Sequence, residues 1–348
     1  MDTPLVIARF LHYASSLLML GEIVFAAVIA GAMSHNGGGQ STPNARYQRL
    51  VRVGGVALVV SVVSGALWFV VKAVEMSGLS LQDTMHRETL SRVLLETTFG
   101  RVWLLRGALS IGIGALLFGR ARVREATMAH GIAFALLSLG GAYVGALAWA
   151  GHAAGGQGVR GGIQLLADVV HLVAASAWLG ALPALVSALR RAASRQAVAL
   201  VHRFSAVGIV MVSALALTGI FNAWVLVGSI SALLETPYGC TLCAKLALFG
   251  LMVALALVNR LRLTPRLGVA DGSRRALTRN ATIEAAAGVG VVALVAVLGI
   301  MVPAVHHLHQ HHHAAAPTRE PPHHEHGPPA ASPLRPASAT AGASWPSA

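Results

Sequence analysis

Charged residues are scarce in this chain. Asp, Glu, Lys and Arg make up only 11% of its 348 residues, whereas 55% are hydrophobic. A soluble domain carries about 25% charged residues, so the composition excludes an ordinary soluble domain. Several apolar runs exceed the roughly 20 residues that a helix needs to cross a bilayer. The sequence therefore predicts an all-α, polytopic membrane protein.

Cysteines are also few, and a nucleotide-binding motif is missing. The chain has two cysteines, Cys240 and Cys243, which are too few for a disulfide framework. It contains no Gly-x-x-x-x-Gly-Lys loop of the kind that cradles nucleotide phosphates. Energy for any transport would then come from an ion gradient or from a partner.

Hydropathy predicts eight membrane spans that form one bundle over residues 1–305. The first span is expected to be retained rather than cleaved as a signal peptide. Charged and apolar residues alternate at residues 75–100, which predicts short amphipathic helices on the outer surface. Residues 306–348 are rich in His, Pro, Ala and Ser and are expected to form a disordered tail. The spans are predicted at residues 5–33, 50–74, 101–119, 127–151, 161–189, 204–228, 240–261 and 283–305.

The basic residues set the expected orientation. A formal net charge of +13 is compatible with a nucleic-acid partner. The arginines, however, gather in alternate loops, near residues 40, 122, 196 and 270. Loops that carry such an excess of arginine face the cytoplasm. We therefore expect a bacterial inner-membrane protein with both termini in the periplasm, in contact with membrane lipid and not with nucleic acid.

With this topology, several candidate metal ligands lie at a similar depth in the outer half of the bundle. Two of them, Asp168 and His171, are three residues apart and share one helical face. Burying such a group in a membrane costs roughly 2–4 kcal/mol unless a partner compensates. Imidazole and thiolate bind copper and zinc, and few carboxylates lie nearby to hold a hard cation. The candidate ligands are His12, His152, Asp168, His171, Cys240 and Cys243, with Glu22 deeper as a possible ion or proton relay.

Each candidate also has a purely structural interpretation. His12 would pack and bond Ser16 or a carbonyl, and His152 would sit at the wet interface. Asp168 and His171 would be a pair that fixes helix contacts, and the two cysteines would be small packing residues. Glu22 would pair with an arginine instead of relaying protons.

The tail carries a denser cluster of histidines. Six lie within eight residues and three more follow, and the run is interrupted in a way that a purification tag is not. Histidine-rich tracts are typical of metal binding. The tail is therefore predicted to collect metal outside the cytoplasm, through His306, His307, His309, His311, His312, His313, His323, His324 and His326.

The fifth span resembles a known family. Asp168-x-x-His171-x-x-Ala-Ala-x-x-Trp178-Leu-Gly180-x-Leu182 is similar to the signature helix of the CopD copper-resistance membrane proteins. The resemblance covers about residues 5–305. It is also carried by Arg9-x-x-His12, Met76-Ser-Gly-Leu, Thr97-Thr-Phe-Gly-Arg-Val-Trp-Leu-Leu-Arg106, Gly151-His152-Ala, Thr218-Gly-x-x-Asn222, Thr236-Pro-Tyr-Gly239 with Lys245, and Asn259-Arg260 with Pro265.

The resemblance implies an eight-span inner-membrane protein that handles copper ions, Cu(I) or Cu(II), often beside a soluble periplasmic copper carrier. In that interpretation the tail gathers the metal, His152 and the cysteines pass it on, and His12, Asp168 and His171 form the membrane centre. Cys240, Cys243 and the histidine-rich tail depart from the usual family pattern.

Two alternatives stay open from the sequence. A b-type haem electron-transfer protein would use membrane histidines as axial ligands, and His12 and His171 are the available pair. A structural scaffold would use the polar residues only to pack its helices.

Overall fold

The computed structural model describes residues 2–30, 48–119, 126–151, 158–192, 194–267 and 272–302. All regular structure in these ranges is helical. The candidate ligand His152 and the whole histidine-rich tail lie outside the described residues.

Within the described residues, the first half of the chain contains four long helices and two short ones. Helix α1 (Asp2–Val24) continues into the π-helical segment η1 (Phe25–Ile29), and η3 (Leu50–Gly54) leads into α3 (Gly55–Ser77). The other elements are α4 (Leu81–Thr84), α5 (Arg87–Glu96), α6 (Thr98–Gly119), α7 (Ala126–Gly145) and the 3₁₀ turn η5 (Ala146–Ala150). The short helices α4 and α5 confirm the amphipathic helices predicted between spans 2 and 3.

The second half also contains long helices, a π-helical segment within one of them, and a short helix between two others. Helix α8 (Gly158–Ala175) passes through the π-helical segment η7 (Ser176–Gly180) into α9 (Leu182–Arg191). Thr236 caps α12 by accepting a hydrogen bond from the Gly239 amide, with Pro237 in the first turn. The remaining elements are α10 (Ser194–Val227), α11 (Ile230–Glu235), α12 (Pro237–Val258), η8 (Asn259–Leu263), η9 (Thr264–Arg266) and α13 (Ser273–Leu298).

The described residues contain eight helices that are long and apolar enough to cross a membrane. Most begin close to their predicted positions, but two of the predicted starts and one predicted end are wrong. Helix α10 begins at Ser194 instead of residue 204, and α13 begins at Ser273 instead of residue 283 and ends at Leu298. Both helices continue through arginine-containing turns, which hydropathy does not count as part of a span.

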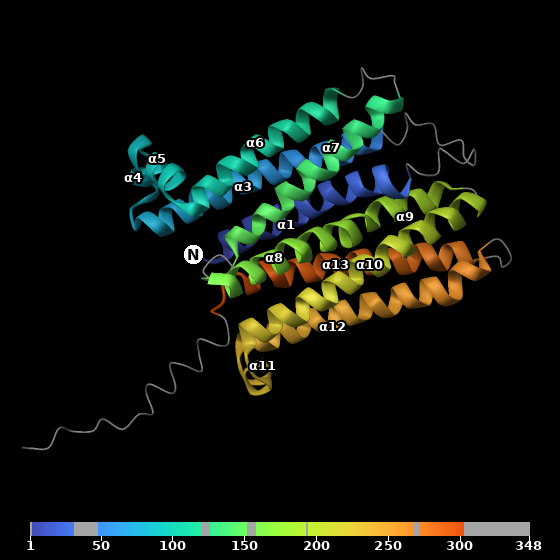
Figure 1. The fold of residues 1–348 in the computed structure, drawn as a ribbon. Helices are drawn as coiled ribbons and strands as arrows, with labels where there is room; N and C mark the ends of the chain where they lie inside the picture. Colours follow the sequence, from blue (N-terminus) through green and yellow to red (C-terminus); the bar gives the residue numbers. More distant parts are fainter. Residues whose placement is uncertain are drawn as a thin grey trace, which may run out of the picture.

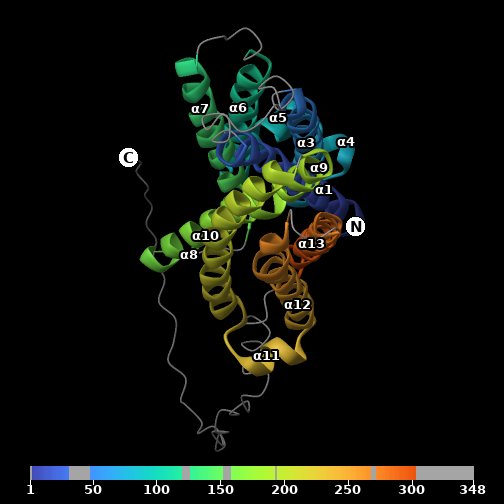
Figure 2. The same ribbon diagram turned by 90° about the vertical axis from the view of Figure 1, so that its right-hand side faces the viewer.

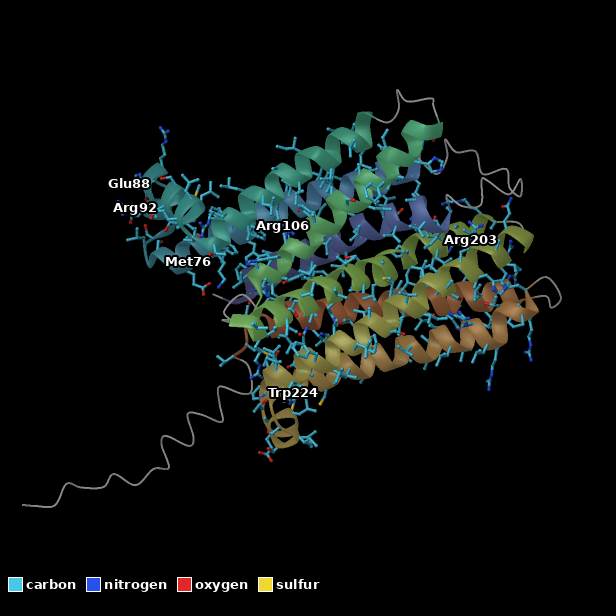
Figure 3. The ribbon with its side chains drawn as sticks, in the orientation of Figure 1. Met76, Glu88, Arg92, Arg106, Arg203 and Trp224 are labelled. Carbon is cyan, nitrogen blue, oxygen red and sulfur yellow. The ribbon has the colours of Figure 1, made fainter. Side chains whose placement is uncertain are left out.

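Helix α1 lies between two groups of helices (Figures 1 and 2). Helices α3, α6 and α7 lie on one side of it, and α8, α9, α10, α12 and α13 lie on the other. Its contacts reach α3, α7, η7 and α13. Figure 3 places Met76, Glu88 and Arg92 at one end of the bundle and Arg203 toward the opposite end.

Two glycines allow α1 and η7 to cross in backbone contact. A Cβ atom added to Gly21 would lie 2.0 Å from the carbonyl carbon of Gly180, and one added to Gly180 would lie 2.0 Å from the carbonyl oxygen of Leu17. No side chain fits at either position, so glycine is required for this approach. The crossing brings Trp178, which is 1% exposed, into the core of the second half.

Candidate functional site

A cavity of about 210 Å³ lies between α1, α8, α10, α12 and α13. Most of its wall is apolar, formed by residues such as Leu147, Leu172 and Val292. Polar side chains converge on it from four of these helices, α1, α8, α10 and α12, which is how ligand sites are built in helical bundles. The polar side chains that line it are Arg9, Tyr13, Asp168, His171, Asn222, Tyr238 and Lys245.

Asp168 is held from the neighbouring helix. The Asn222 amide nitrogen on α10 donates a hydrogen bond of 2.5 Å to Asp168 Oδ1. The other amide atom, Asn222 Oδ1, is buried and has no hydrogen-bond partner among the described residues. A buried orphan oxygen is unusual. Together with the Asp168 carboxylate, it gives the cavity two oxygen groups that are able to accept a ligand.

His171 is oriented by Thr218 on the same neighbouring helix. Its Nδ1 lies 2.9 Å from the Thr218 hydroxyl oxygen, and that hydroxyl donates to the Ala214 carbonyl at 2.6 Å. Since the single hydroxyl hydrogen is used on Ala214, the hydroxyl accepts from His171 Nδ1–H. In a neutral imidazole this leaves the lone pair on Nε2, and no residue in the described ranges bonds to it. His171 therefore keeps one nitrogen available to a ligand.

Asp168 and His171 share the cavity but not a hydrogen bond. Each bonds to a different residue of α10, Asn222 for Asp168 and Thr218 for His171. The Thr218 hydroxyl, and not the Asp168 carboxylate, therefore orients the imidazole. Lys245 enters the same cavity from α12, and no ion pair joins it to Asp168 within the described part of the chain.

His12 lies in a second polar cluster, between α1, α3 and α6. Its Nδ1 lies 2.8 Å from the Ser61 carbonyl oxygen, which only accepts, so Nδ1 carries the hydrogen. Arg106 Nη2 lies 2.7 Å from Nε2, and a guanidinium only donates, so Nε2 is the acceptor. Both ring nitrogens are therefore occupied by protein groups.

Aromatic rings close this second cluster. The rings of Trp68 and Trp103 lie 5.6 Å and 5.3 Å from the His12 ring, and Arg106 lies 3.9 Å from the centre of the Tyr143 ring. His12 and Arg106 are 1% and 3% exposed. The Arg106 guanidinium also donates to the Tyr143 carbonyl. Such a packed cation among rings is a structural arrangement with little room for a further group.

The structure does not gather the predicted membrane centre into one group. Among the residues that it describes, no three His, Cys, Asp or Glu side chains come together as metal ligands would. Asp168 and His171 line the cavity, whereas His12 bonds to Ser61 and Arg106 in the cluster beside it.

The two cysteines lie on the first turns of α12 and do not line the cavity. The Cys240 thiol is exposed, Cys243 is half-buried, and neither forms a disulfide. Their sulfur atoms face the Leu234 and Leu233 carbonyls of the preceding short helix α11, at 3.5 Å and 3.9 Å. The residues of α12 that do line the cavity are Tyr238, Leu242 and Lys245.

Glu22 is paired, as one of its two interpretations expected. Arg49 contacts both carboxylate oxygens, at 2.6 Å and 3.1 Å, and donates to the Ser187 hydroxyl at 2.7 Å. A bidentate arginine satisfies a buried carboxylate well. The pair joins η3 to α1 and α9.

One buried polar group was missed by the sequence reasoning. Asn259 donates to Glu284, and Asn280 donates to Asn259 at 3.0 Å. The predicted eighth span began at residue 283, which placed Glu284 at the water-exposed start of that span. The actual helix begins ten residues earlier and buries Glu284 to 2% exposure. The sequence signal was a lone glutamate within an otherwise apolar stretch of that helix.

The fold and this cavity define a polytopic α-helical membrane protein with a partly polar site inside its bundle. Two family models match: "Copper resistance protein D-like, N-terminal domain" over residues 1–162 and "Copper resistance protein D" over residues 198–298. The chain is 32% identical over 319 residues to "Copper resistance protein D" of Pseudomonas syringae pv. tomato, covering 87% of this chain and 98% of that protein. This chain therefore belongs to the copper resistance protein D family.

Two further relatives are more distant. "Inner membrane protein YebZ" of Escherichia coli K12 is 28% identical over 264 residues, which is 74% of this chain and 84% of that protein. "Copper transport protein CutJ" of Bacillus subtilis is 30% identical over 225 residues, which is 63% of this chain and 39% of that protein. Together with the eight apolar helices, these relatives make this chain a multi-pass protein of the inner membrane.

Proposed function

We propose that this chain handles copper ions in copper transport or resistance, and that the cavity of Asp168 and His171 is where the ion is bound within the membrane. One observation carries the proposal. His171 is held by Thr218 with Nε2 left available, in the same cavity as the Asp168 carboxylate. Copper is the cargo in this account, and imidazole is one of its preferred ligands.

The route to the cavity follows from the proposed orientation. Both chain termini are placed in the periplasm, so that the tail histidines collect copper there. His152, Cys240 and Cys243 pass the ion on, with or without a soluble periplasmic carrier. Reporter fusions at Arg122 and Ala348 test the orientation, and a cytoplasmic tail would remove its proposed role.

Metal analysis of protein truncated after Pro303 tests the membrane site directly. Without the tail histidines, purified protein equilibrated with copper is expected to retain copper. The same protein with His171→Ala is expected to lose it, and one with His202→Ala to keep it, because His202 is exposed on α10. Equal copper in all three proteins would contradict the proposal.

A haem site is not favoured by the described residues. It would need facing histidines with free nitrogens on two helices. Both nitrogens of His12 are bonded to Ser61 and Arg106. The expected absorption spectrum of the purified protein has no Soret band.

A further inference from the structure

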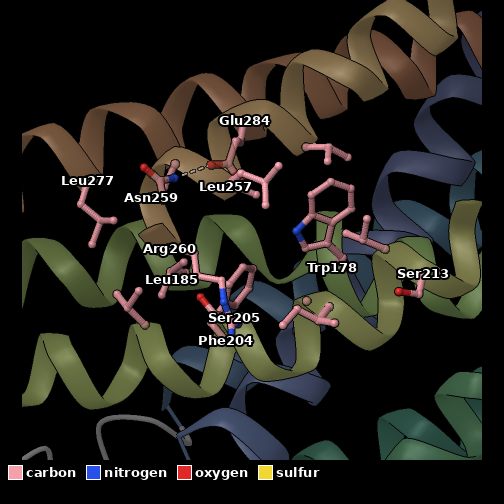
Figure 4. Close-up of a pocket in the computed structure, with 17 residues that line it drawn as sticks. Trp178, Leu185, Phe204, Ser205, Ser213, Leu257, Asn259, Arg260, Leu277 and Glu284 are labelled. Carbon is pink, nitrogen blue, oxygen red and sulfur yellow. Dashed lines mark hydrogen bonds between the residues drawn. The ribbon is translucent and has the colours of Figure 1, made fainter. Parts of the chain in front are cut away.

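A second cavity lies nearer the N-terminal end of α13 than the first, between α9, α10, α12, η8 and α13 (Figure 4), and is called the deeper cavity. It has a volume of about 190 Å³, and its wall is mostly apolar, with Trp178, Phe204 and Leu277 among its residues. Glu284, Asn259 and Arg260 supply the amide and charged groups. The proposed function makes no use of this cavity.

Glu284 is held there by neutral groups alone. Asn259 Nδ2 donates to Glu284 Oε1, and the Asn259 carbonyl oxygen Oδ1 accepts from Asn280 Nδ2 at 3.0 Å. The Thr264 hydroxyl donates to the Asn259 backbone carbonyl at 2.7 Å, which fixes this turn. Glu284 Oε2 receives no hydrogen bond within the described ranges. The network therefore orients one carboxylate oxygen and leaves the other toward the cavity.

Glu22 and Glu284 are equally buried but differently paired. Both are 2% exposed inside membrane spans. Glu22 has a bidentate arginine, whereas no ion pair to Glu284 forms among the described residues. A buried carboxylate without a cation is costly when ionised, and it is relieved when it takes up a proton. Intramembrane acids of this kind mark ion and proton pathways.

The charged surroundings of Glu284 are sparse. Arg260 on η8 lines the same cavity and is exposed, and the lining residues from α9 and α10 are uncharged. The nearest charges on α13 itself, Arg275 and Arg279, line a separate groove with Arg190 and Arg274. Arg260 is therefore the one charged side chain that shares the cavity with this carboxylate in the described structure.

Helix α13 passes both cavities. Ala281 and Glu284 line the deeper one, and Val291, Val292 and Val295 line the one that holds Asp168 and His171. Gly288 lies between, where a Cβ atom would meet Leu179 at 3.4 Å and Met252 at 3.6 Å. The apolar side chains of Leu179 and Met252 therefore pack beside Gly288, and this pair is called the barrier. On the opposite wall, Trp178 lines the deeper cavity and its neighbour Leu179 lines the other.

We propose that Glu284 is a proton-binding site whose protonation is coupled to occupancy of the Asp168–His171 cavity. A proton from solvent forms an O–H bond at Oε2, and it is released again when copper moves past the barrier. The copper half of this coupling rests on the proposed function, whereas the proton site does not. Carboxylate and amide oxygens suit a proton or a hard cation better than copper.

The proton site is tested without copper. Infrared spectra of the full-length protein in liposomes, recorded over a pH series, are expected to contain a carboxyl C=O band that titrates and that disappears in Glu284→Gln. The exposed Glu88, paired with Arg92, provides the control variant Glu88→Gln, which keeps the band. Glu22→Gln also keeps it, although the protein should be less stable. A band that is unchanged in Glu284→Gln would overturn the proposal.

The coupling is tested in the same liposomes with a pH-sensitive dye enclosed inside them. Copper ions are then added to the outside. The parent protein should change the internal pH when copper is added, and Glu284→Gln should lose nearly all of that change, because the amide neither binds nor releases a proton in this pH range. Copper affinity of the parent should depend on pH and that of the variant should not, because coupling between proton binding and copper binding is reciprocal. A copper-induced pH change in Glu284→Gln that equals the change in the parent protein overturns the inference. Failure of the parent to bind copper, with the infrared band intact, contradicts the proposed function and leaves the proton site standing.

Discussion

His12 and His171 lie in two polar regions of one bundle, and the regions differ in what they leave open. Around His12, Ser61 and Arg106 occupy both ring nitrogens, and the aromatic rings of Trp68 and Trp103 close the space. Around His171, a threonine occupies one nitrogen and a cavity adjoins the ring. Two membrane histidines of similar sequence context thus have opposite local chemistry.

The difference teaches that burial cost alone does not identify a functional group. Both histidines are expensive to place in a membrane. In the first region both ring nitrogens of His12 are bonded, although the buried indole nitrogens of Trp68 and Trp103 have no hydrogen-bond partner among the described residues. In the second region Asn222 Oδ1 and Arg9 Nε are unpaired, and His171 keeps one ring nitrogen available beside a cavity. The region with an available imidazole nitrogen beside a cavity is the better candidate for binding a ligand.

The substitution His171→Ala should have the largest effect, which is a loss of copper affinity. Removing the imidazole that has an available nitrogen in this cavity should weaken copper affinity of the tail-deleted protein by more than about 100-fold, because a ligand is lost outright. Thermal stability should change little, since His171 is half-buried and makes one hydrogen bond. Chelator competition measures the affinity, with His202→Ala as the control. If His171→Ala binds copper as tightly as the parent protein, His171 is a structural residue like His12.

His12→Ala should have the opposite pattern. It removes the acceptor of one Arg106 nitrogen and one of the hydrogen bonds to the Ser61 carbonyl, and it opens a void beside Trp68. The free energy of unfolding should fall by about 2–4 kcal/mol for this combination of a lost buried partner and a cavity. Unfolding in mixed detergent measures it. Copper affinity of the folded fraction should stay within about two-fold of the parent. If copper binding is lost while stability is kept, His12 belongs to the metal site after all.

Asp168→Asn should weaken copper affinity by roughly 10–100-fold, the range for altering a group that supports a metal site. The amide keeps the shape of the carboxylate and a carbonyl oxygen near Asn222, so insertion into the membrane should be normal. Copper titration and membrane abundance are measured together. An unchanged affinity with normal abundance would mean that Asp168 only ties α8 to α10.

Much of the fold can be predicted from the sequence, because the hydropathy of a stretch predicts a span and the arginines of a loop predict its side of the membrane. The span starts at residues 50 and 237 were predicted closely, and the shared face of Asp168 and His171 follows from their spacing. The early start of α13, which buries Glu284, could not be read from hydropathy, since its first turns are polar. The π-helical turn η7 is set by the packing of Gly180 on α1, which no local pattern encodes.

The site was predicted less completely than the fold. Matched depth suggested that His12 and His171 would meet. The partners that decide their roles, however, are Arg106 and Thr218, which are 94 and 47 residues away in the chain. A sequence gives the depth of a side chain in a helix but not the rotation of one helix against another. The contrast between an occupied and an available imidazole depends on that rotation.

Thr218→Val is the smallest and sharpest test of the contrast. Valine keeps the volume of threonine but removes the hydroxyl that accepts from His171 Nδ1 and donates to the Ala214 carbonyl. The imidazole retains its lone pair and loses only the bond that fixes its tautomer and orientation. One hydrogen bond contributes about 0.5–1.5 kcal/mol, so copper affinity should fall by about 2- to 10-fold. Thr241→Val is the matched control, because Thr241 is half-buried on α12 outside the cavity lining and its hydroxyl bonds to the Pro237 carbonyl. A loss as large as that of His171→Ala would make Thr218 a copper ligand in its own right, and no loss would mean that the Thr218 bond does not set the nitrogen that binds.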